Sequence, residues 1–355
     1  MGVVSLGERG EVARWCAMRV ALAGLGVVGR SLLELVRDRR EELLKVYGLN
    51  PRFVAVADKS GAVARATGIS PHEILEQKKR GGITGIEEAE AKSSTLLDML
   101  GELDIDVYID ATPTNIVDGE PSYSLIRKAI LARADVITVN KGPLALAFPA
   151  IRELAERRGV IFRFSGTVGG GMPVLEFAKE CARADTIISI EGVLNGTTNF
   201  ILTRMEEEGL DFPTALKQAQ ELGYAERDPT LDIKGLDTAC KITILANAVL
   251  GMNATLHDVE VVGIDGIARE DVVDALKGGE VIRLIGRAGK KLSVAPERIP
   301  KGDTLNVKEA MNAVRLTTKY SGRHTITGKG AGGYETATAI LRDLISIKQR
   351  RLVEA

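Results

Sequence analysis

Short apolar runs alternate with amphipathic stretches over the first half of the chain. The apolar runs are seven residues long and rich in Val, Ile and Ala, at 19–25, 52–58, 106–112, 135–141 and 160–166. Between them, apolar residues recur with helical spacing among charged residues, at 28–48, 122–134 and 146–159. This alternation of strands and helices predicts an α/β fold with a Rossmann-type, doubly wound parallel sheet. The run 52–58 has no polar residue inside it, which is typical of a strand covered on both faces.

The pattern changes after residue 165. Strand-like runs are separated by long helical stretches, the strands at 186–195, 259–267 and 281–289 and the helices at 198–209, 212–223 and 233–251. This mixture predicts a second domain with a mixed sheet and helices. A last helical run, 334–350, follows a glycine-rich stretch. The predicted division is an extension (1–17), a first domain (18–164), a second domain (165–327) and a C-terminal segment (328–355) that returns to the first domain.

Composition narrows the classes of protein to consider. A net charge of −1, with Lys and Glu interspersed, gives no electrostatic reason to expect nucleic acid or a membrane surface as a partner. The longest apolar runs are about ten residues, short of the roughly 20 that a membrane-spanning helix needs. The three cysteines, Cys16, Cys181 and Cys240, are too far apart for a disulfide framework or a zinc site, so we expect a reduced, cytoplasmic protein. Scarce Gln with abundant Arg, Glu and Lys favours a thermophilic source.

Three glycines between the first strand and the first helix have the spacing of a dinucleotide-binding turn. Gly24 permits the tight turn, Gly26 lets the backbone approach a pyrophosphate, and Gly29 allows close packing of helix on strand. The start of the helix, at Val27 and Val28, adds free N–H groups and the positive end of the helix dipole. The alternative is a tight turn that binds no ligand. The surrounding pattern of strands and helices favours the cofactor, with these five residues in contact with it.

The end of the second strand predicts which cofactor is bound. Asp58 can accept hydrogen bonds from a ribose 2′-hydroxyl, which favours NAD. Lys59 follows directly, and Lys79 lies in a downstream cationic stretch at 78–80, so cations could instead hold a 2′-phosphate. The alternative for both lysines is a solvated surface position. We predict NADP as the cofactor, with NAD accepted, and Asp58, Lys59 and Lys79 as contacts.

Seven motifs in order make the chain resemble homoserine dehydrogenase over residues 18–348. They are AGLGVVGR, DATPTN, VITVNKGPLA, GTVGGGMPV, LNGTTNFILTRM, LGYAERDPTLDIKGLDTACK and GKGAGGYETATAILRDL. The resemblance implies interconversion of L-homoserine and L-aspartate 4-semialdehyde with NAD(P), in threonine and methionine biosynthesis. It further implies a dinucleotide-binding first domain, a catalytic and dimerisation second domain, and a homodimer. Because the chain ends soon after the last motif, feedback inhibition by threonine through a C-terminal regulatory domain is not expected.

Two lysines are the candidates for proton transfer. The cofactor carries only the hydride, so another group must take the hydroxyl proton and return it in the reverse reaction. Lys241 lies four residues after Asp237 on a helix that is otherwise small and apolar; the alternative is an ordinary surface ion pair. The resemblance implies that Lys241 is the proton donor and acceptor. Lys141 ends a predicted parallel strand, where doubly wound sheets bind ligands. Two such lysines, if buried, are expected to depress each other's pKa.

Acidic and amide side chains near Lys241 are candidates for the substrate's ammonium and carboxylate. The resemblance assigns substrate contact to Glu226 and Asp237. Asp232 precedes the Lys241 helix, and we predict that it caps the helix N-terminus rather than binding substrate. The amides and hydroxyls of 195–199 suit either a substrate carboxylate or a helix cap.

The resemblance implies further contacts at the remaining motifs. Thr112 and Asn115 are expected near the nicotinamide ribose, and Asn140, Lys141 and Gly330 are further expected cofactor contacts. Relatives bind sodium at the glycine-rich turn, which implies ligands at Ser165, Val168, Gly170 and Met172. Ser165 stands where a glutamate is frequent in the family, so one carboxylate near the ion is missing.

Two other functions are alternatives to this one. Another NADP-dependent reductase, such as aspartate-semialdehyde dehydrogenase, needs a thioester-forming cysteine with a base partner. Cys181 and Cys240 have apolar neighbours on predicted helices, which argues against that chemistry. The other alternative is a nucleotide-binding module without turnover, which the joint presence of the candidate lysines and carboxylates disfavours. The histidines, His72, His257 and His324, have positions more typical of structural roles.

Overall fold

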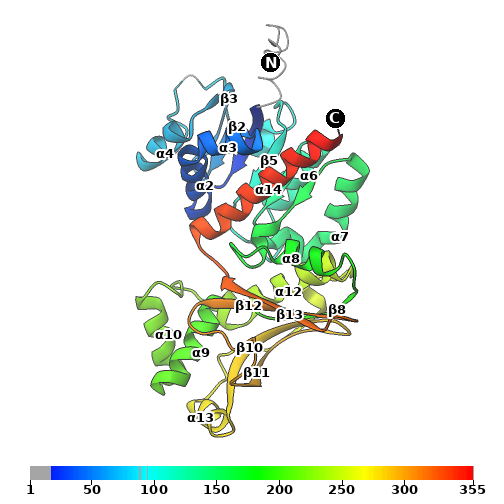
Figure 1. The fold of residues 1–355 in the computed structure, drawn as a ribbon. Helices are drawn as coiled ribbons and strands as arrows, with labels where there is room; N and C mark the ends of the chain where they lie inside the picture. The colour runs from blue at the N-terminus through cyan, green and yellow to red at the C-terminus, as the bar shows by residue number, and fades with distance from the viewer. Residues whose placement is uncertain (1–16, 88, 94, 355) are drawn as a thin grey trace. The chain divides into compact units, whose positions relative to one another are not determined.

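The computed structural model describes residues 17–87, 89–93 and 95–354, and it divides the chain into two compact units (Figure 1). The first unit comprises the chain up to Asn140, Ala150–Gly166 and the segment from Thr336 onward. The second comprises Lys141–Pro149 and Thr167–Glu335. The division falls within two helices, α7 (Lys141–Arg158) and α14 (Gly333–Glu354), and the backbone of α7 breaks at Ala147 (φ −144°) just before Pro149. A proline inside a helix removes a hydrogen bond and clashes with the preceding turn, which explains the kink.

A seven-stranded sheet forms the centre of the first unit, in the order β4-β3-β2-β1-β5-β6-β7. The strands β2, β1, β5, β6 and β7 are parallel, which confirms the predicted Rossmann-type sheet, and β3 and β4 add antiparallel strands at one edge. The bounds are β1 (Ala17–Ala23), β2 (Asn50–Asp58), β3 (Gly61–Ile69), β4 (Ala91–Ser93), β5 (Val107–Asp110), β6 (Asp135–Thr138) and β7 (Phe162–Arg163). The β2–β3 hairpin was not predicted, and it places Asp58 at a tight turn.

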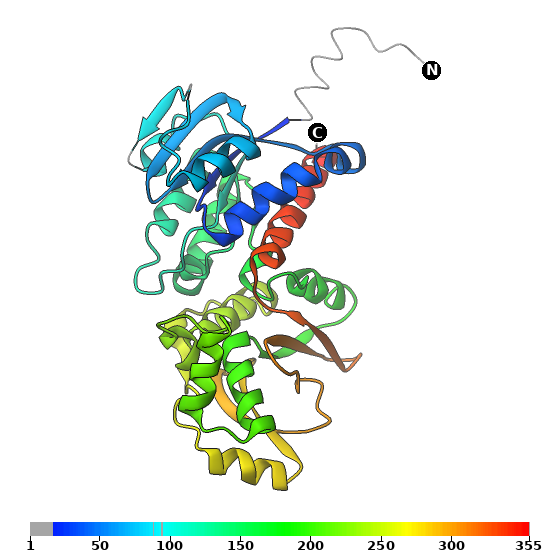
Figure 2. The same cartoon turned by 90° about the vertical axis from the view of Figure 1, so that its left-hand side faces the viewer.

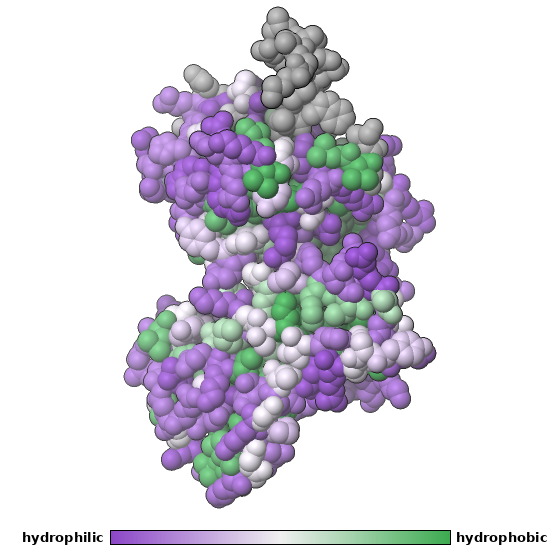
Figure 3. All heavy atoms as spheres, viewed as in Figure 1, coloured by the Kyte–Doolittle hydropathy of each residue, from purple (hydrophilic) through white to green (hydrophobic). Residues whose placement is uncertain are grey.

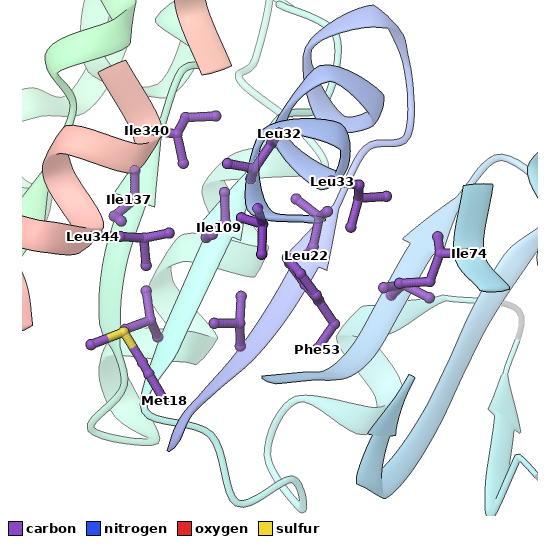
Figure 4. Close-up of a cluster of buried hydrophobic side chains, with 14 of the residues drawn as sticks. Met18, Leu22, Leu32, Leu33, Phe53, Ile74, Ile109, Ile137, Ile340 and Leu344 are labelled. Carbon is purple, nitrogen blue, oxygen red and sulfur yellow. The ribbon is translucent and has the colours of Figure 1, made fainter. Parts of the chain in front are cut away.

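Helices α2 and α14 pack on this sheet through one apolar cluster. They lie side by side in Figures 1 and 2, although they come from opposite ends of the chain. Figure 4 shows Leu32 and Leu33 of α2 with Ile340 and Leu344 of α14, against Leu22, Ile109 and Ile137 of the strands. Burial of each such side chain stabilises the fold by about 1.5–3 kcal/mol. The helices of this unit, with α7 shared, are α2 (Val27–Asp38), α3 (Arg40–Tyr47), α4 (Pro71–Lys79), α5 (Leu96–Met99), α6 (Ser122–Leu131) and α14 (Gly333–Glu354).

The second unit contains a six-stranded mixed sheet in the order β13-β12-β8-β10-β11-β9. The β11–β9 pair is parallel and the other neighbours are antiparallel, so the predicted mixed α+β domain is confirmed. The bounds are β8 (Ile187–Val193), β9 (Val259–Val261), β10 (Glu280–Ala288), β11 (Leu292–Pro300), β12 (Met311–Thr318) and β13 (Arg323–Lys329). The helices are α8 (Val174–Cys181), α9 (Gly196–Glu208), α10 (Phe212–Glu221), α11 (Thr230–Ile233), α12 (Leu236–Val249) and α13 (Arg269–Lys277), with 3-10 turns at Ser165–Thr167 and Leu256–Asp258.

The packing of α12 on this sheet depends on a glycine in β10. A Cβ added to Gly286 would lie 3.0 Å from Thr238 Cγ2 and 3.1 Å from Ile242 Cγ1, both on α12. The absence of a side chain there lets the helix lie close to the strand, and ten consecutive α12 residues, 238–247, are buried. Lys241 lies in the middle of that buried stretch.

The surface is polar, as the composition leads one to expect. On the face drawn in Figure 3, hydrophilic residues cover most of each unit. Among the described helices, none is both long enough and apolar enough to cross a membrane.

Candidate active site

The glycine turn after β1 has a separate structural reason for each of its three glycines. Gly24 has φ 93°, and a Cβ there would lie 2.2 Å from the carbonyl oxygen of Ala111 at the end of β5. A Cβ on Gly29 would lie 2.0 Å from Gly24 O, so α2 packs directly on the turn. A Cβ on Gly26, by contrast, would meet no described atom within 4 Å. The open position at Gly26 is the one expected where a pyrophosphate approaches the backbone, so the turn fits a dinucleotide.

The first turn of α2 suits an anion as well. Gly26 is the N-cap, and the helix has no acidic residue in its first turn. Val27 is 61% exposed, so the start of the helix is accessible to solvent, whereas Val28 is partly buried against the core of the sheet. The backbone N–H groups of such a turn carry the positive end of the helix dipole.

The carboxylate of Asp58, at the end of β2, is held by the first lysine of the cationic stretch 78–80. Lys78 Nζ, from α4, forms an ion pair with Asp58 Oδ2. Ser60 donates its backbone N–H (2.7 Å) and its hydroxyl (2.5 Å) to Oδ1. Burial alone would raise the pKa of Asp58, but the hydrogen bonds from Lys78 and Ser60 outweigh it and lower the pKa. Lys59 is exposed in the turn, and Lys79 is 72% exposed and pairs with Glu76 at 2.7 Å.

A buried aspartate ties together the ends of β5 and β6. Asp110 is fully buried and accepts hydrogen bonds from Thr112 Oγ1 (2.6 Å), Thr138 Oγ1 (3.0 Å) and the Ser122 hydroxyl. Burial raises the pKa of this carboxyl, and the hydrogen bonds only partly offset the effect. Asn140 Nδ2 in turn donates to Thr112 Oγ1 (3.0 Å). Thr112 and Asn140, both predicted cofactor contacts, therefore belong to one network centred on Asp110, which sequence reasoning missed.

Asn115 has a different setting. Its Nδ2 donates to Asp118 Oδ1 (2.7 Å) and to Glu120 O (3.0 Å), and its Oδ1 accepts from the N–H of Val117 (2.9 Å). The side chain thus folds the loop that leads to α6.

In the second unit, one carboxylate lies between the two candidate lysines. Asp237 Oδ2 is 2.7 Å from Lys241 Nζ, one turn further along α12. Asp237 Oδ1 is 3.3 Å from the Nζ of Lys141, the first residue of α7. Lys241 is only 6% exposed, and its Nζ also donates to Leu194 O at 2.5 Å. The surface ion pair that was the alternative for Lys241 is excluded by this burial.

The charges at this centre perturb one another strongly. Burial would raise the pKa of Asp237, but the two ammonium groups outweigh it and the pKa lies well below its usual range. Burial would lower the pKa of Lys141, but the charge of Asp237 outweighs it and raises the pKa. The expected depression of the pKa is therefore wrong for Lys141. The reason is that the prediction considered two lysines alone. The carboxylate of Asp237 contacts both of them, and a nearby opposite charge favours the charged form of a lysine.

Asn195 links the lysine centre to the helix α9. Its Oδ1 accepts from the N–H of Thr198 (2.9 Å) and caps α9, while its Nδ2 donates to Asp237 Oδ2 (2.9 Å) and Asp232 Oδ1 (2.6 Å). The prediction that Asp232 caps the Lys241 helix is wrong, because Gly235 occupies that position and Asp232 lies inside α11. Burial, and then the charge of Asp237, raise the pKa of Asp232.

Comparison with known proteins agrees with this geometry. Residues 24–165 match the family model "Homoserine dehydrogenase, NAD binding domain", and residues 173–345 match "Homoserine dehydrogenase". The chain belongs to the homoserine dehydrogenase family. It is 43% identical over 331 residues to a homoserine dehydrogenase of Methanocaldococcus jannaschii, covering 93% of this chain and 98% of the relative. It is 36% identical to an NAD(+)-dependent homoserine dehydrogenase of Pseudomonas canavaninivorans, covering 93% and 96%.

Solved structures of the family have the same fold. A homoserine dehydrogenase from Thiobacillus denitrificans has a TM-score of 0.82 at 32% identity, covering 95% of this chain and 74% of that one. A hyperthermophilic archaeal homoserine dehydrogenase in complex with NADPH has a TM-score of 0.82 at 25% identity, covering 94% and 98%. The chain is therefore an NAD(P)-dependent oxidoreductase of this family.

The remaining predicted substrate residue, Glu226, is exposed, unlike Lys241. It lies in the loop between α10 and α11, and its backbone carbonyl accepts from Gln220 Nε2 (3.2 Å). Asn199 has a structural role, since its Nδ2 donates to the carbonyls of Val307 (3.0 Å) and Glu309 (2.9 Å).

The predicted sodium ligands divide between the two units. Gly169 and Gly170, in the second unit, both have positive φ (86° and 56°), which only glycine adopts easily. Val168 and Met172 are buried, and Met172 O accepts from the N–H of Val174 (2.9 Å). Ser165, in the first unit, donates its hydroxyl to Asp343 Oδ1 (2.7 Å). These groups are less well suited to a sodium ion than the glycine turn after β1 is to a dinucleotide.

Gly330 lies against a buried amide. A Cβ there would be 1.8 Å from Asn312 Nδ2, and a Cβ on Gly170 would be 2.8 Å from Gly330 O. The loop of Gly330 and the turn of Gly170 therefore meet closely within the second unit. In the described residues, no group of three or more His, Cys, Asp or Glu side chains is arranged to hold a metal ion.

The cysteines and histidines do not have the properties of nucleophiles or bases in a site. Burial, and then the charge of Asp237, raise the pKa of Cys240 to about 12. Burial also raises the pKa of Cys181. Cys16 lies outside the described residues. His72 is on α4, His257 is in the 3-10 turn before β9, and His324 Nε2 is 3.0 Å from Ser321 Oγ on the β12–β13 hairpin.

Proposed function

We propose that this enzyme interconverts L-homoserine and L-aspartate 4-semialdehyde, with NADP(H) as the preferred cofactor and NAD(H) accepted. The observation that carries the proposal is the buried Lys141–Asp237–Lys241 cluster, in a chain of the homoserine dehydrogenase family. The first unit is the dinucleotide-binding domain and the second the catalytic domain.

The bound nicotinamide supplies the hydride transfer. Lys241 exchanges the proton of the substrate oxygen: as an ammonium it donates to the carbonyl oxygen of the semialdehyde, and as an amine it accepts from the hydroxyl of homoserine. Leu194 O and Asp237 hold its Nζ at 2.5 Å and 2.7 Å, so the group is fixed in one position. Such a preorganised acid or base contributes roughly 10²–10⁴-fold to a rate.

Lys141 positions the substrate oxygen beside the proton-transfer group. Because Asp237 raises its pKa, Lys141 is an ammonium at neutral pH, and an ammonium stabilises negative charge that develops on that oxygen. Lys141 directly follows Asn140, which the Thr112 network fixes at the end of β6. Because the two residues are adjacent, Asn140 and Lys141 are expected to contribute together to cofactor and substrate binding.

Asp237 and Glu226 bind the substrate ammonium. A carboxylate can accept about four hydrogen bonds, and Asp237 receives three, from Lys141, Lys241 and Asn195. One acceptor position on Asp237 is therefore left for a substrate N–H group. Glu226 is exposed and can complete the ammonium contact from its loop.

We further propose a cytoplasmic homodimer that acts in threonine and methionine biosynthesis. A sodium ion at the carbonyls of Val168, Gly170 and Met172 remains a prediction, which rests on the two left-handed glycines of that turn. Replacing sodium chloride by choline chloride should lower turnover if the ion is required. Sedimentation equilibrium at micromolar protein would measure the oligomeric state.

The alternative reductase requires a reactive thiolate. With its pKa raised to about 12, Cys240 is a protonated thiol at neutral pH and a poor nucleophile. The deciding assay follows reduced nicotinamide absorbance with L-homoserine and NADP, then with NAD. Turnover on homoserine excludes a non-catalytic module. Turnover only with aspartate semialdehyde and phosphate would instead favour aspartate-semialdehyde dehydrogenase and contradict the proposal.

A further inference from the structure

The turn that follows β2 is built around the Asp58 carboxylate. Asp58 pairs with Gly61 across the β2–β3 hairpin, so Lys59 and Ser60 form its two-residue turn. The Asp58 side chain is 3% exposed and that of Lys78 17%, so the ion pair between them is largely removed from water. Ser60 Oγ also accepts the backbone N–H of Ile83 (3.0 Å), which fixes the turn to the segment after α4.

Donors from the chain itself occupy most of the acceptor positions of this carboxylate. Oδ1 accepts two hydrogen bonds from Ser60 and Oδ2 accepts one from Lys78. A carboxylate has about four acceptor positions, so one remains on Oδ2 for a ribose hydroxyl. Lys78 has three N–H donors, of which Asp58 uses one, so two remain for a phosphate beside the same oxygen.

An acidic residue at this place in a Rossmann fold normally selects NAD, because it binds the 2′-hydroxyl and repels a 2′-phosphate. The charge of Asp58 is compensated by a contacting ammonium, which weakens the repulsion. The lowered pKa of Asp58 agrees with a persistent ion pair, although burial acts in the opposite direction.

The neighbouring cations are less well placed for this role. Lys59 is exposed in the turn. Lys79 points its charge to Glu76 in an i,i+3 pair on the helix surface, with side chains 72% and 42% exposed. Exposed ion pairs of this kind contribute little to stability and do not fix the position of the side chains. Lys78 is the cation that the structure holds at the end of β2.

We propose that Lys78 is the residue that determines cofactor choice in this enzyme: by neutralising Asp58 it admits the 2′-phosphate of NADP(H), while Asp58 retains one acceptor for the 2′-hydroxyl of NAD(H). The inference rests on the proposed function, since it concerns the cofactor of that reaction. It shifts the predicted 2′-phosphate contact from Lys59 and Lys79 to Lys78.

The test is direct binding of NADPH and NADH to the full-length protein without substrate, followed by nucleotide fluorescence. Lys78→Met should raise the Kd for NADPH about tenfold or more, the size of a lost charged hydrogen bond, and change the Kd for NADH much less. Because that variant leaves Asp58 without its partner, Asp58→Asn/Lys78→Met is measured as well, and it should regain the part of the NADPH affinity that the uncompensated Asp58 charge removes. Lys45→Met, which removes an exposed lysine paired with Glu41, is the matched control and should change neither Kd. Circular dichroism melts check the fold of each variant.

Three results would overturn the inference. The first is an equal loss of affinity for NADPH and NADH in Lys78→Met. The second is a larger loss of NADPH affinity in Lys79→Met than in Lys78→Met. The third is a double variant that binds NADPH as weakly as Lys78→Met does. Failure of the proposed function is distinct, because the wild-type protein would then bind neither coenzyme or show no turnover of homoserine. A wild type that binds both and turns over homoserine, with an unchanged coenzyme ratio in Lys78→Met, refutes only the role of Lys78.

Discussion

Replacing Asp237 by asparagine keeps the shape of the side chain and removes the charge that the buried Lys241 and the partly buried Lys141 share. At 2.7 Å and 3.3 Å, with an effective dielectric constant of about 20, the two attractions are about 6 and about 5 kcal/mol before desolvation. Most of this offsets the cost of burying the charges. Removing one partner of a buried ion pair typically costs about 3–5 kcal/mol, because the remaining charge is uncompensated. We expect Asp237→Asn to lower the free energy of unfolding by about that amount at neutral pH.

The pH dependence of this loss gives the sharper test. In the wild type the folded-state pKa of Lys141 is raised, so its contribution to stability is complete below the unfolded pKa of about 10.4 and is lost as the pH rises through the folded pKa. In Asp237→Asn burial, the largest influence on Lys141, is opposed only by weaker attractions such as that of Asp232, and the pKa of Lys141 falls below the unfolded value. The variant should therefore gain stability as the pH rises from 7 to 10, about where the wild type begins to lose it.

Urea unfolding midpoints at the two pH values measure both effects, and initial rates on homoserine measure the accompanying loss of kcat/KM. Asp265→Asn is the matched control, since it breaks a 2.6 Å pair with Lys234 on the surface of the same unit. Exposed pairs of that kind are worth about 0–1 kcal/mol. If Asp237→Asn cost no more than the control, or lost stability with rising pH as the wild type does, the reasoning about a shared buried charge would be refuted.

Three further substitutions test separate parts of the argument. Lys241→Ala should abolish turnover while NADPH binding, followed by fluorescence, stays near that of the wild type; retention of most activity would remove Lys241 from proton transfer. Gly26→Ala should weaken cofactor binding with little change in the melting temperature, because its Cβ meets no described atom, whereas Gly29→Ala should lower the melting temperature, because its Cβ would clash with Gly24 O. Equal melting temperatures for the two variants would contradict that distinction. Cys240→Ala should keep most of the turnover, because a thiol with its pKa raised to about 12 is not a nucleophile at neutral pH; loss of activity in a folded variant would reopen the thioester alternative.

The strands of the first unit were predictable where they are buried on both faces. Each of the five apolar runs overlaps one of the five parallel strands, although the edge strand β7 covers only Phe162–Arg163 of the run 160–166. A central strand in a doubly wound sheet has no polar face to interrupt the pattern. The antiparallel strand β3, Gly61–Ile69, was missed. Its burial is complete only in its first four residues and then alternates with exposure, so its sequence lacks a continuous apolar run. In the second unit, β11 and β13 were missed for the same reason of mixed exposure. β12 was missed although it is mostly buried, because the polar residues Asn312 and Arg315 interrupt its apolar run.

The candidate site was predictable only where its residues are close in sequence or lie at strand ends. The spacing of Asp237 and Lys241 on one helix predicts their contact. No local pattern predicts that Lys78 reaches Asp58, because the hairpin and α4 bring them together over 20 residues. Asp110 was missed for another reason. Its role as the centre of a hydrogen-bond network depends on the depth of burial at the strand end, which the sequence does not state.

The error about Lys141 shows how a third charge reverses an electrostatic inference. Two buried ammonium groups alone repel, and each is then easier to deprotonate. Asp237 lies between them at contact distance from both, and the attraction that Lys141 gains from it outweighs the influences that would lower the pKa of Lys141. Lys141, Lys241 and Asp237 together carry one net positive charge, which Leu194 O and the nearby carboxylate of Asp232 compensate further. Because Asp237 raises the pKa of Lys141, that lysine stays an ammonium at neutral pH. Oxidation requires loss of a proton from this cluster, and therefore gains from alkaline conditions that at the same time remove part of its stability.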